Sequence, residues 1–145
     1  MPKTDINIDL SSEPRLLASV RGLIRTYLLN EGFDAERAGE IVLAVDEACT
    51  NAMRHSYGGN TEGRLRLTLR RNDSAIEFVL RDRGVPVPQE KCARKEIVAP
   101  DTEHLMPGGL GVQLMYSVFD EVKFRPGKTE GNRVVMRLKL PEKPG

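Results

Sequence analysis

Apolar residues near the N-terminus recur first at every second position and then at every third or fourth. Ile6, Ile8 and Leu10 alternate with polar residues, which is the period of a half-buried strand. Ser11-Ser12-Glu13-Pro14 then has the composition of a helix start. The apolar stripe that follows ends before Gly32, where a glycine can adopt the left-handed conformation that stops a helix. Its members are Leu16, Leu17, Val20, Leu23, Ile24, Tyr27 and Leu28. We therefore predict a strand followed by an amphipathic helix.

A second helix is predicted to begin after Asp34, a residue type that caps helix N-termini. Its apolar stripe indicates one buried face, and the pattern ends near Tyr57-Gly58-Gly59. The members of this stripe are Ala38, Ile41, Val45, Ala48 and Ala52. The face outside the stripe carries Glu47 and Asn51, which lie four residues apart.

From Arg64 onward the hydrophobic period changes to two, which predicts a pair of strands. Leucines alternate with basic residues and a threonine through residue 70, and Asn72-Asp73 turns the chain. In the returning strand Phe78 and Leu80 share one face, and the same alternation places Asp82 on that apolar face at the strand end. A buried carboxylate there needs a partner.

The last third of the chain begins with a segment that has no sustained period. Residues 85–107 contain four prolines and mixed charges, so we predict a long loop, and loops of this length in compact domains usually serve function. We interpret this segment as a lid over a binding site. A helix over about 110–119, a strand with Val122 and Phe124, a turn over 127–131 and a final strand over 134–140 complete the pattern.

Together these elements predict a two-layer α/β sandwich, formed by a mainly antiparallel sheet with helices on one face. The other face is left to the arginines of residues 64–70, Thr68 and Lys139. With 39% hydrophobic and 30% charged residues, residues 1–145 have the composition of a single globular domain.

Charge and cysteine usage narrow the class of function. The 22 basic and 21 acidic residues give a net charge of +1, without the basic excess typical of nucleic-acid or anionic-membrane binders. Apolar runs fall short of the roughly 18 residues that span a bilayer, so we expect a cytoplasmic protein with no membrane contact. Cys49 and Cys92 form no C-x-x-C pair, and we interpret both as reduced thiols without a nucleophilic role.

Glu47 and Asn51 are the first pair of residues with chemical potential. Residues four apart on a helix lie on one face, about 6 Å from each other along the axis. An amide oxygen suits Mg²⁺, and a carboxylate one turn away can orient or deprotonate a hydroxyl or water for attack on a phosphate. Such a pair is also common on a solvated helix face, so by itself it leaves both interpretations open.

Two glycine-containing segments add a second and a third element. Gly108, Gly109, Leu110 and Gly111 lead into a helix, whose free N–H groups and dipole attract phosphate, although a simple hinge would have the same sequence. The segment lacks the Gly-Lys-Ser/Thr ending of a P-loop. Further upstream, Asp82 precedes Arg83-Gly84, so its carboxylate could accept a hydrogen bond from an adenine amino group; a strand-ending turn is the alternative.

The order of these motifs resembles that of a known superfamily. Residues 40–52 resemble the N-box of the GHKL ATPases, and specifically of the bacterial anti-sigma-factor serine/threonine kinases. Residues 82–86 resemble the D-x-G box of that group, and residues 108–114 its second glycine box. The resemblance extends from about Ile6 to Leu140.

This resemblance implies a Bergerat-type ATP-binding fold with a defined set of site residues. Asn51 would hold Mg²⁺, Glu47 would act as general base, Asp82 with Gly84 would bind adenine, and residues 85–107 would close over phosphates held by residues 108–111. It further implies a kinase that phosphorylates an anti-anti-sigma protein and sequesters a sigma factor. A homodimer is implied as well.

The sequence departs from the family pattern at Pro86, Val87, Gln113 and Asn132. These departures concern nucleotide affinity more than family membership. Two other classes of function are alternatives to the kinase. One is a binding module in which nucleotide sets the shape of a partner-binding surface, although such a module has no need of the base Glu47. The other is the catalytic domain of a sensor histidine kinase, for which 145 residues leave no room for a dimerisation helix pair with a phosphoacceptor histidine.

Overall fold

The computed structural model describes residues 2–56, 63–83, 109–125 and 131–142. The strands and the three α-helices follow one another in the order that the hydrophobic pattern predicts. The elements are β1 (Lys3–Ser11), η1 (Pro14–Leu16), α1 (Leu17–Asn30), α2 (Ala35–Asn51), η2 (Ala52–Ser56), β2 (Arg64–Arg71), β3 (Ala75–Asp82), α4 (Gly109–Val118), β4 (Glu121–Arg125) and β5 (Arg133–Lys139).

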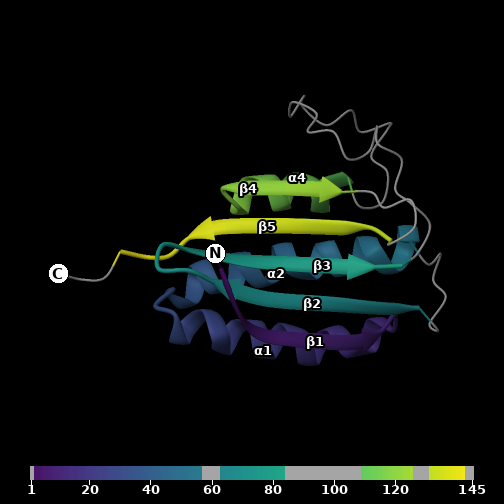
Figure 1. The fold of residues 1–145 in the computed structure, drawn as a ribbon, viewed down its shortest axis with the longest axis horizontal. Coiled ribbons are helices and arrows are strands. Elements are labelled where there is room, and N and C mark those ends of the chain that lie inside the picture. The colour runs from purple at the N-terminus through teal and green to yellow at the C-terminus, as the bar shows by residue number, and fades with distance from the viewer. Residues whose placement is uncertain (1, 57–62, 84–108, 126–130, 143–145) are drawn as a thin grey trace.

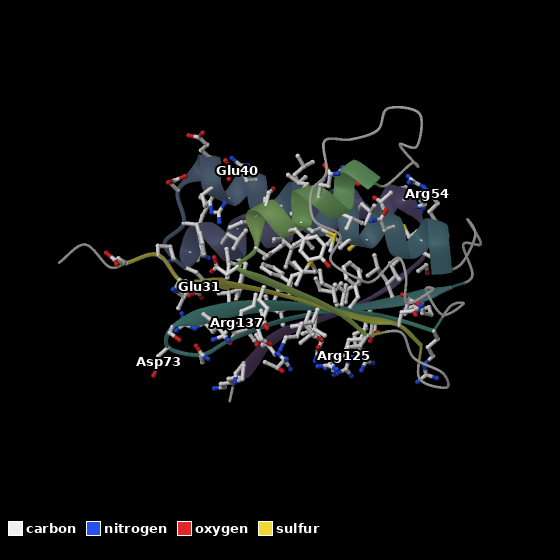
Figure 2. The ribbon with its side chains drawn as sticks, turned by 90° about the horizontal axis from the view of Figure 1, so that it is seen from above. Glu31, Glu40, Arg54, Asp73, Arg125 and Arg137 are labelled. Carbon is white, nitrogen blue, oxygen red and sulfur yellow. The ribbon has the colours of Figure 1, made fainter. Side chains whose placement is uncertain are left out.

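The five strands form one sheet in the order β1-β2-β3-β5-β4, and every neighbouring pair is antiparallel. Helices α1, α2 and α4 all lie on one side of this sheet (Figures 1 and 2). The predicted two-layer α/β sandwich is therefore confirmed. The opposite side, which we call the helix-free face, has no helix over it among the described residues.

The core lies between the sheet and the helices. Alternate residues of the central strands turn their side chains toward the helices, as the period of two requires. The fully buried residues from these strands include Leu65, Leu67, Leu69, Ile76, Phe78, Leu80, Met136 and Leu138. All five apolar residues predicted for the α2 stripe are buried, whereas Leu23 of the predicted α1 stripe is 38% exposed. In the part of the chain that the structure describes, no helix is long and apolar enough to cross a membrane.

The predicted helix cap at Asp34 and helix stop at Gly32 are confirmed, and the predicted helix start with an early proline is confirmed except for the side-chain cap. The Asp34 side chain accepts a hydrogen bond of 2.7 Å from the Arg37 backbone and caps α2, and Gly32 has a φ of 98° beyond the end of α1. Ser12 caps nothing, because its Oγ is buried and has no hydrogen-bond partner in the described structure. Pro14 instead begins a short 3-10 turn, η1, and α1 starts at Leu17.

Arg37 joins α2 to the C-terminal end of α4. Its Nη2 donates a part-buried hydrogen bond of 2.8 Å to the carbonyl of Val118, the last residue of α4, and its Nη1 lies 3.0 Å from Glu40. The last carbonyls of a helix have no intrahelical partner and form the negative end of the helix dipole. A cation there is favoured both by the hydrogen bond and by the dipole. This contact holds α4 in place relative to α2.

We predict that Arg37→Ala lowers the free energy of unfolding by about 1–2 kcal/mol, because it removes a charged hydrogen bond to a part-buried carbonyl. Urea unfolding followed by circular dichroism measures this loss. Glu40→Ala, which removes only the exposed i,i+3 partner, is the control and should cost less than about 0.5 kcal/mol. Equal losses in the two variants would contradict a role for the Val118 contact.

Candidate functional site

Three elements that carry the predicted site residues end or begin at the same end of the molecule. The C-terminal end of α2, the end of β3 and the start of α4 lie together there in both views (Figures 1 and 2). Helix α2 packs against both α4 and β3. The fold therefore gathers at one edge of the sandwich residues that are up to 64 positions apart in sequence, from Glu47 to Gly111.

Asn51 is the last residue of α2, and its side-chain oxygen is in an unusual position. The Oδ1 atom is buried and accepts no hydrogen bond from any residue that the structure describes. A buried acceptor without a donor normally costs free energy, so such an atom in a native structure points to a missing ligand. The chain continues from Asn51 into a π-helical turn, η2, and turns of this kind frequently occur at functional sites.

Glu47 is half-buried one turn before Asn51. It differs from its acidic neighbour Asp46 in its side-chain contacts. Asp46 accepts a hydrogen bond of 2.9 Å from Arg21 of α1, so its charge serves to join the two helices. Glu47 has no ion pair or hydrogen bond among residues 2–56, 63–83, 109–125 and 131–142. Unlike Asp46, the Glu47 carboxylate is therefore not engaged by a cation in the described structure.

Asp82 ends β3 on the helix side of the sheet and is only 6% exposed. Its predicted need for a partner is met by Asn132, which is 8% exposed and whose Nδ2 donates to Asp82 Oδ1 at 3.0 Å. The Asp82 backbone N–H also donates to the Asn132 carbonyl at 3.0 Å. The sequence singles out Asn132 as a departure near the nucleotide, and the structure places it directly on the adenine-binding candidate.

Gly131 is a site residue that the sequence reading missed. It has a φ of 82°, and a Cβ atom placed on it would lie 1.8 Å from the carbonyl oxygen of Asp82 and 2.7 Å from Arg83 Cα. Only a glycine allows the start of β5 to approach the end of β3 so closely. The turn over 127–131 was predicted, but the strand to which this glycine packs cannot be read from its local sequence.

The second glycine segment lies partly within the described structure. Helix α4 begins at Gly109, so Gly109, Leu110 and Gly111 form its first turn. Backbone N–H groups of a first turn have no intrahelical acceptor and favour an anion. Gly84, Gly108 and the predicted lid over 85–107 lie outside the described residues, as do Pro86 and Val87. Gln113 is half-buried in the second turn of α4.

The donor set fits a metal that takes most of its ligands from a nucleotide. Among the residues with a described position, no group of three or more His, Cys, Asp and Glu side chains could hold a metal ion. Mg²⁺ needs few protein ligands, since it completes its octahedron with phosphate oxygens and water. The buried, unpaired Oδ1 of Asn51 has the chemistry of one such ligand.

Cys49 takes no part in this site. The side chain is fully buried in the core, and burial raises the pKa of its thiol to about 12. The thiol is therefore protonated at neutral pH and is not a nucleophile. This agrees with the interpretation of Cys49 as a reduced core residue. Cys92 and the side chain of His55 lie outside the described part of the chain.

Fold and site together define an ATP-binding domain of the histidine kinase-like type. The chain belongs to the histidine kinase-like ATPase domain family, whose pattern matches residues 10–138. The predicted superfamily is thereby confirmed.

Among characterised proteins, the chain is similar to serine-protein kinases named RsbW. It is 28% identical to RsbW of Listeria innocua over 143 residues, which cover 95% of this chain and 88% of the relative. It is 27% identical to RsbW of Bacillus velezensis over 123 residues, covering 81% and 76% of the two chains.

Solved structures support the fold. The crystal structure of the RsbU and RsbW domains of a Mycobacterium tuberculosis protein superposes with a TM-score of 0.63 at 18% identity, covering 93% of this chain and 31% of that longer one. The catalytic domain of the histidine kinase ThkA superposes with a TM-score of 0.57 at 10% identity, covering 94% and 99%. At these identities the likeness concerns the fold alone.

Proposed function

We propose that this protein is an ATP-dependent serine/threonine kinase that phosphorylates an anti-anti-sigma protein and sequesters a sigma factor. The observation that carries the proposal is a pair of residues on α2. Among the residues that the structure describes, the half-buried Glu47 has no partner, and the buried Oδ1 of Asn51, one turn later, has no hydrogen-bond donor. Similarity to serine-protein kinases over 95% of the chain supports the choice of reaction.

In this proposal each residue has a separate task. Asn51 binds Mg²⁺, which supplies charge neutralisation at the transferred phosphoryl group of bound ATP. Glu47 orients the attacking hydroxyl of the substrate protein and accepts its proton. Asp82, with its orientation fixed by Asn132, accepts a hydrogen bond from the adenine amino group, and Gly84 lets the base lie close. Phosphoryl transfer then depends mostly on positioning and on electrostatic stabilisation.

The phosphates would lie against the start of α4. The backbone of Gly108, Gly109, Leu110 and Gly111 would donate N–H groups to them, and residues 85–107 would close over the bound nucleotide. We also propose that residues 1–145 act as one domain, that the protein is cytoplasmic, and that it forms a homodimer without direct contact with nucleic acid or membrane.

Phosphate transfer to a partner tests this function. The purified protein is incubated with γ-labelled Mg-ATP and the anti-anti-sigma protein of the same organism, and the label on that protein is then exposed to acid. We expect label that survives acid, since phosphoserine and phosphothreonine are acid-stable. Acid-labile label would indicate a histidine kinase instead. ATP binding without any transfer would favour the alternative, a nucleotide-gated binding module with no or vestigial kinase activity.

A further inference from the structure

The helix-free face of the sheet carries a row of four arginines that no task above uses. The strand registers pair Arg66 with Arg81, Arg81 with Arg133, and Arg133 with Arg125, so the row crosses β2, β3, β5 and β4 at right angles to the strands. We call it the arginine row. Figure 2 shows Arg125 on the side of the sheet away from the helices. The row continues on β1 with Asp9, opposite Arg66.

Acidic residues balance this row at one end only. Arg66 forms an ion pair of 3.1 Å with Asp9, and the Asp9 carboxyl has a lowered pKa because Arg66 donates to it. The side chains of Arg81, Arg125 and Arg133 form no ion pair or hydrogen bond with any residue that the structure describes. The Nε atom of Arg133 is even buried without an acceptor. Like charges directly opposite each other and unpaired buried donors both destabilise a fold.

A second row on the same face shows how these strands balance charge elsewhere. Four residues along each strand from the arginine row, Arg70 pairs with Glu77, Glu77 with Arg137, and Arg137 with Glu121. Signs alternate in this row, and Arg70 lies 2.6 Å from Glu77. The same four strands therefore carry one neutralised row and one row that is almost entirely positive. The contrast indicates that the arginine row is matched by something other than the residues that the structure describes.

We propose that the arginine row is a docking surface for a protein partner that presents an acidic helix. Neighbouring strands lie about 4.8 Å apart, so four arginines span about 14 Å. A helix laid across the strands repeats every 5.4 Å, and carboxylates on four successive turns span about 16 Å. Long arginine side chains absorb this difference, and guanidinium groups bind carboxylates in a bidentate manner.

Composition favours a protein over a nucleic acid as the occupant. On the helix-free face, the described residues include no aromatic side chain on which a base could stack, and the chain as a whole has a net charge of only +1. The row beside the arginines contains the half-buried Val135, which offers apolar contact. A second copy with the same row opposed would bring like charges together.

This docking surface goes beyond the proposed function and does not depend on nucleotide binding. Arg81 and Arg133 adjoin Asp82 and Asn132 in sequence, but they point to the opposite side of the sheet. A partner on the row would therefore lie beneath the nucleotide site and leave it open.

Fluorescence anisotropy with a synthetic peptide tests the proposal. The probe is a labelled helical peptide of about 15 residues with glutamates one turn apart, titrated at low salt where screening is weak. The test variant combines Arg81→Gln, Arg125→Gln and Arg133→Gln, and the control combines Arg15→Gln, Arg25→Gln and Arg54→Gln from the exposed helix side. We expect the test variant to bind at least about tenfold more weakly and the control to stay within about twofold.

Several results would overturn the proposal. In the binding assay, these are failure of the wild type to bind the peptide, equal binding of a peptide with glutamine in place of glutamate, and an equal loss of affinity in the control variant. Tighter binding of a single-stranded oligonucleotide than of the peptide would also contradict it. So would a change from dimer to monomer in the test variant, measured by light scattering. Because the test variant removes like charges, its melting temperature should equal or exceed that of the wild type. Should it fail to fold, Arg125→Gln alone, at an exposed position of edge strand β4, is expected to weaken binding about threefold.

Discussion

Replacement of Glu47 by glutamine should abolish phosphoryl transfer while leaving ATP binding intact. A general base contributes about 10²- to 10⁴-fold to such a reaction, and glutamine keeps the size of the side chain without its ability to accept a proton. The measurement is the rate of transfer at saturating Mg-ATP, together with the dissociation constant of ATP. We expect a rate loss in this range and a dissociation constant within about threefold of wild type.

Asp46→Asn is the matched control, because it removes a carboxylate from the adjacent position. Asp46 is engaged by Arg21, so its loss should weaken the contact between α1 and α2 and leave the transfer rate nearly unchanged. A Glu47→Gln variant that transfers phosphate at the wild-type rate would refute the assignment of the base. A larger rate loss in Asp46→Asn would show that the wrong carboxylate has been chosen.

Gly131→Ala should destabilise the fold more than an alanine at Gly22, Gly32 or Gly39. The new Cβ would lie 1.8 Å from the Asp82 carbonyl oxygen, and alanine disfavours the φ of 82° at this position. Backbone atoms cannot move aside as a flexible side chain can, so we expect a loss of about 3 kcal/mol and a drop in melting temperature of about 10 °C. Displacement of Asp82 should also weaken ATP binding.

Two other glycines separate the causes of this effect. Gly32 has a φ of 98°, and a Cβ atom on it would meet only the Pro141 side chain at 4.0 Å, so Gly32→Ala should cost only the conformational penalty of about 1 kcal/mol. Gly22 lies within α1 with nothing within 4 Å, so Gly22→Ala should stabilise the fold by about 0.5–1 kcal/mol. Calorimetric melting of the three variants measures these differences. If Gly131→Ala melts no lower than Gly32→Ala, the close approach to Asp82 is unimportant.

Local sequence pattern was sufficient for most of the fold. The stripe of α2 and the alternation in β2 and β3 identify buried faces because burial depends directly on the helical and strand periods. Helix ends were harder to predict. Asp34 and Ser12 are both capping types, but Ser12 follows β1, and its backbone N–H donates to the Gly63 carbonyl. That non-local bond fixes the chain beside β2, and local sequence gives no sign of it.

The candidate site was predictable in its parts but not in its contacts. The position of Asp82 on the apolar face showed that it needs a partner, yet the partner Asn132 lies 50 residues away. The close approach of Gly131 to Asp82 and the alignment of the arginine row are equally non-local. Both depend on the strand order, which places β5 between β3 and β4. The alternation of apolar and polar residues puts arginines on the helix-free face, whereas the register between strands decides which of these arginines lie opposite one another.

The most direct test of the nucleotide site is calorimetric titration with ATP, with and without Mg²⁺, of the wild type and of Asn51→Ala. Asn30→Ala, which changes an asparagine at the end of α1, is the control. We predict that Mg²⁺ tightens ATP binding to the wild type and to the control by at least about tenfold, and that Asn51→Ala loses this dependence because the buried Oδ1 no longer reaches the metal. Absence of ATP binding, or equal dependence on Mg²⁺ in all three proteins, would contradict the account.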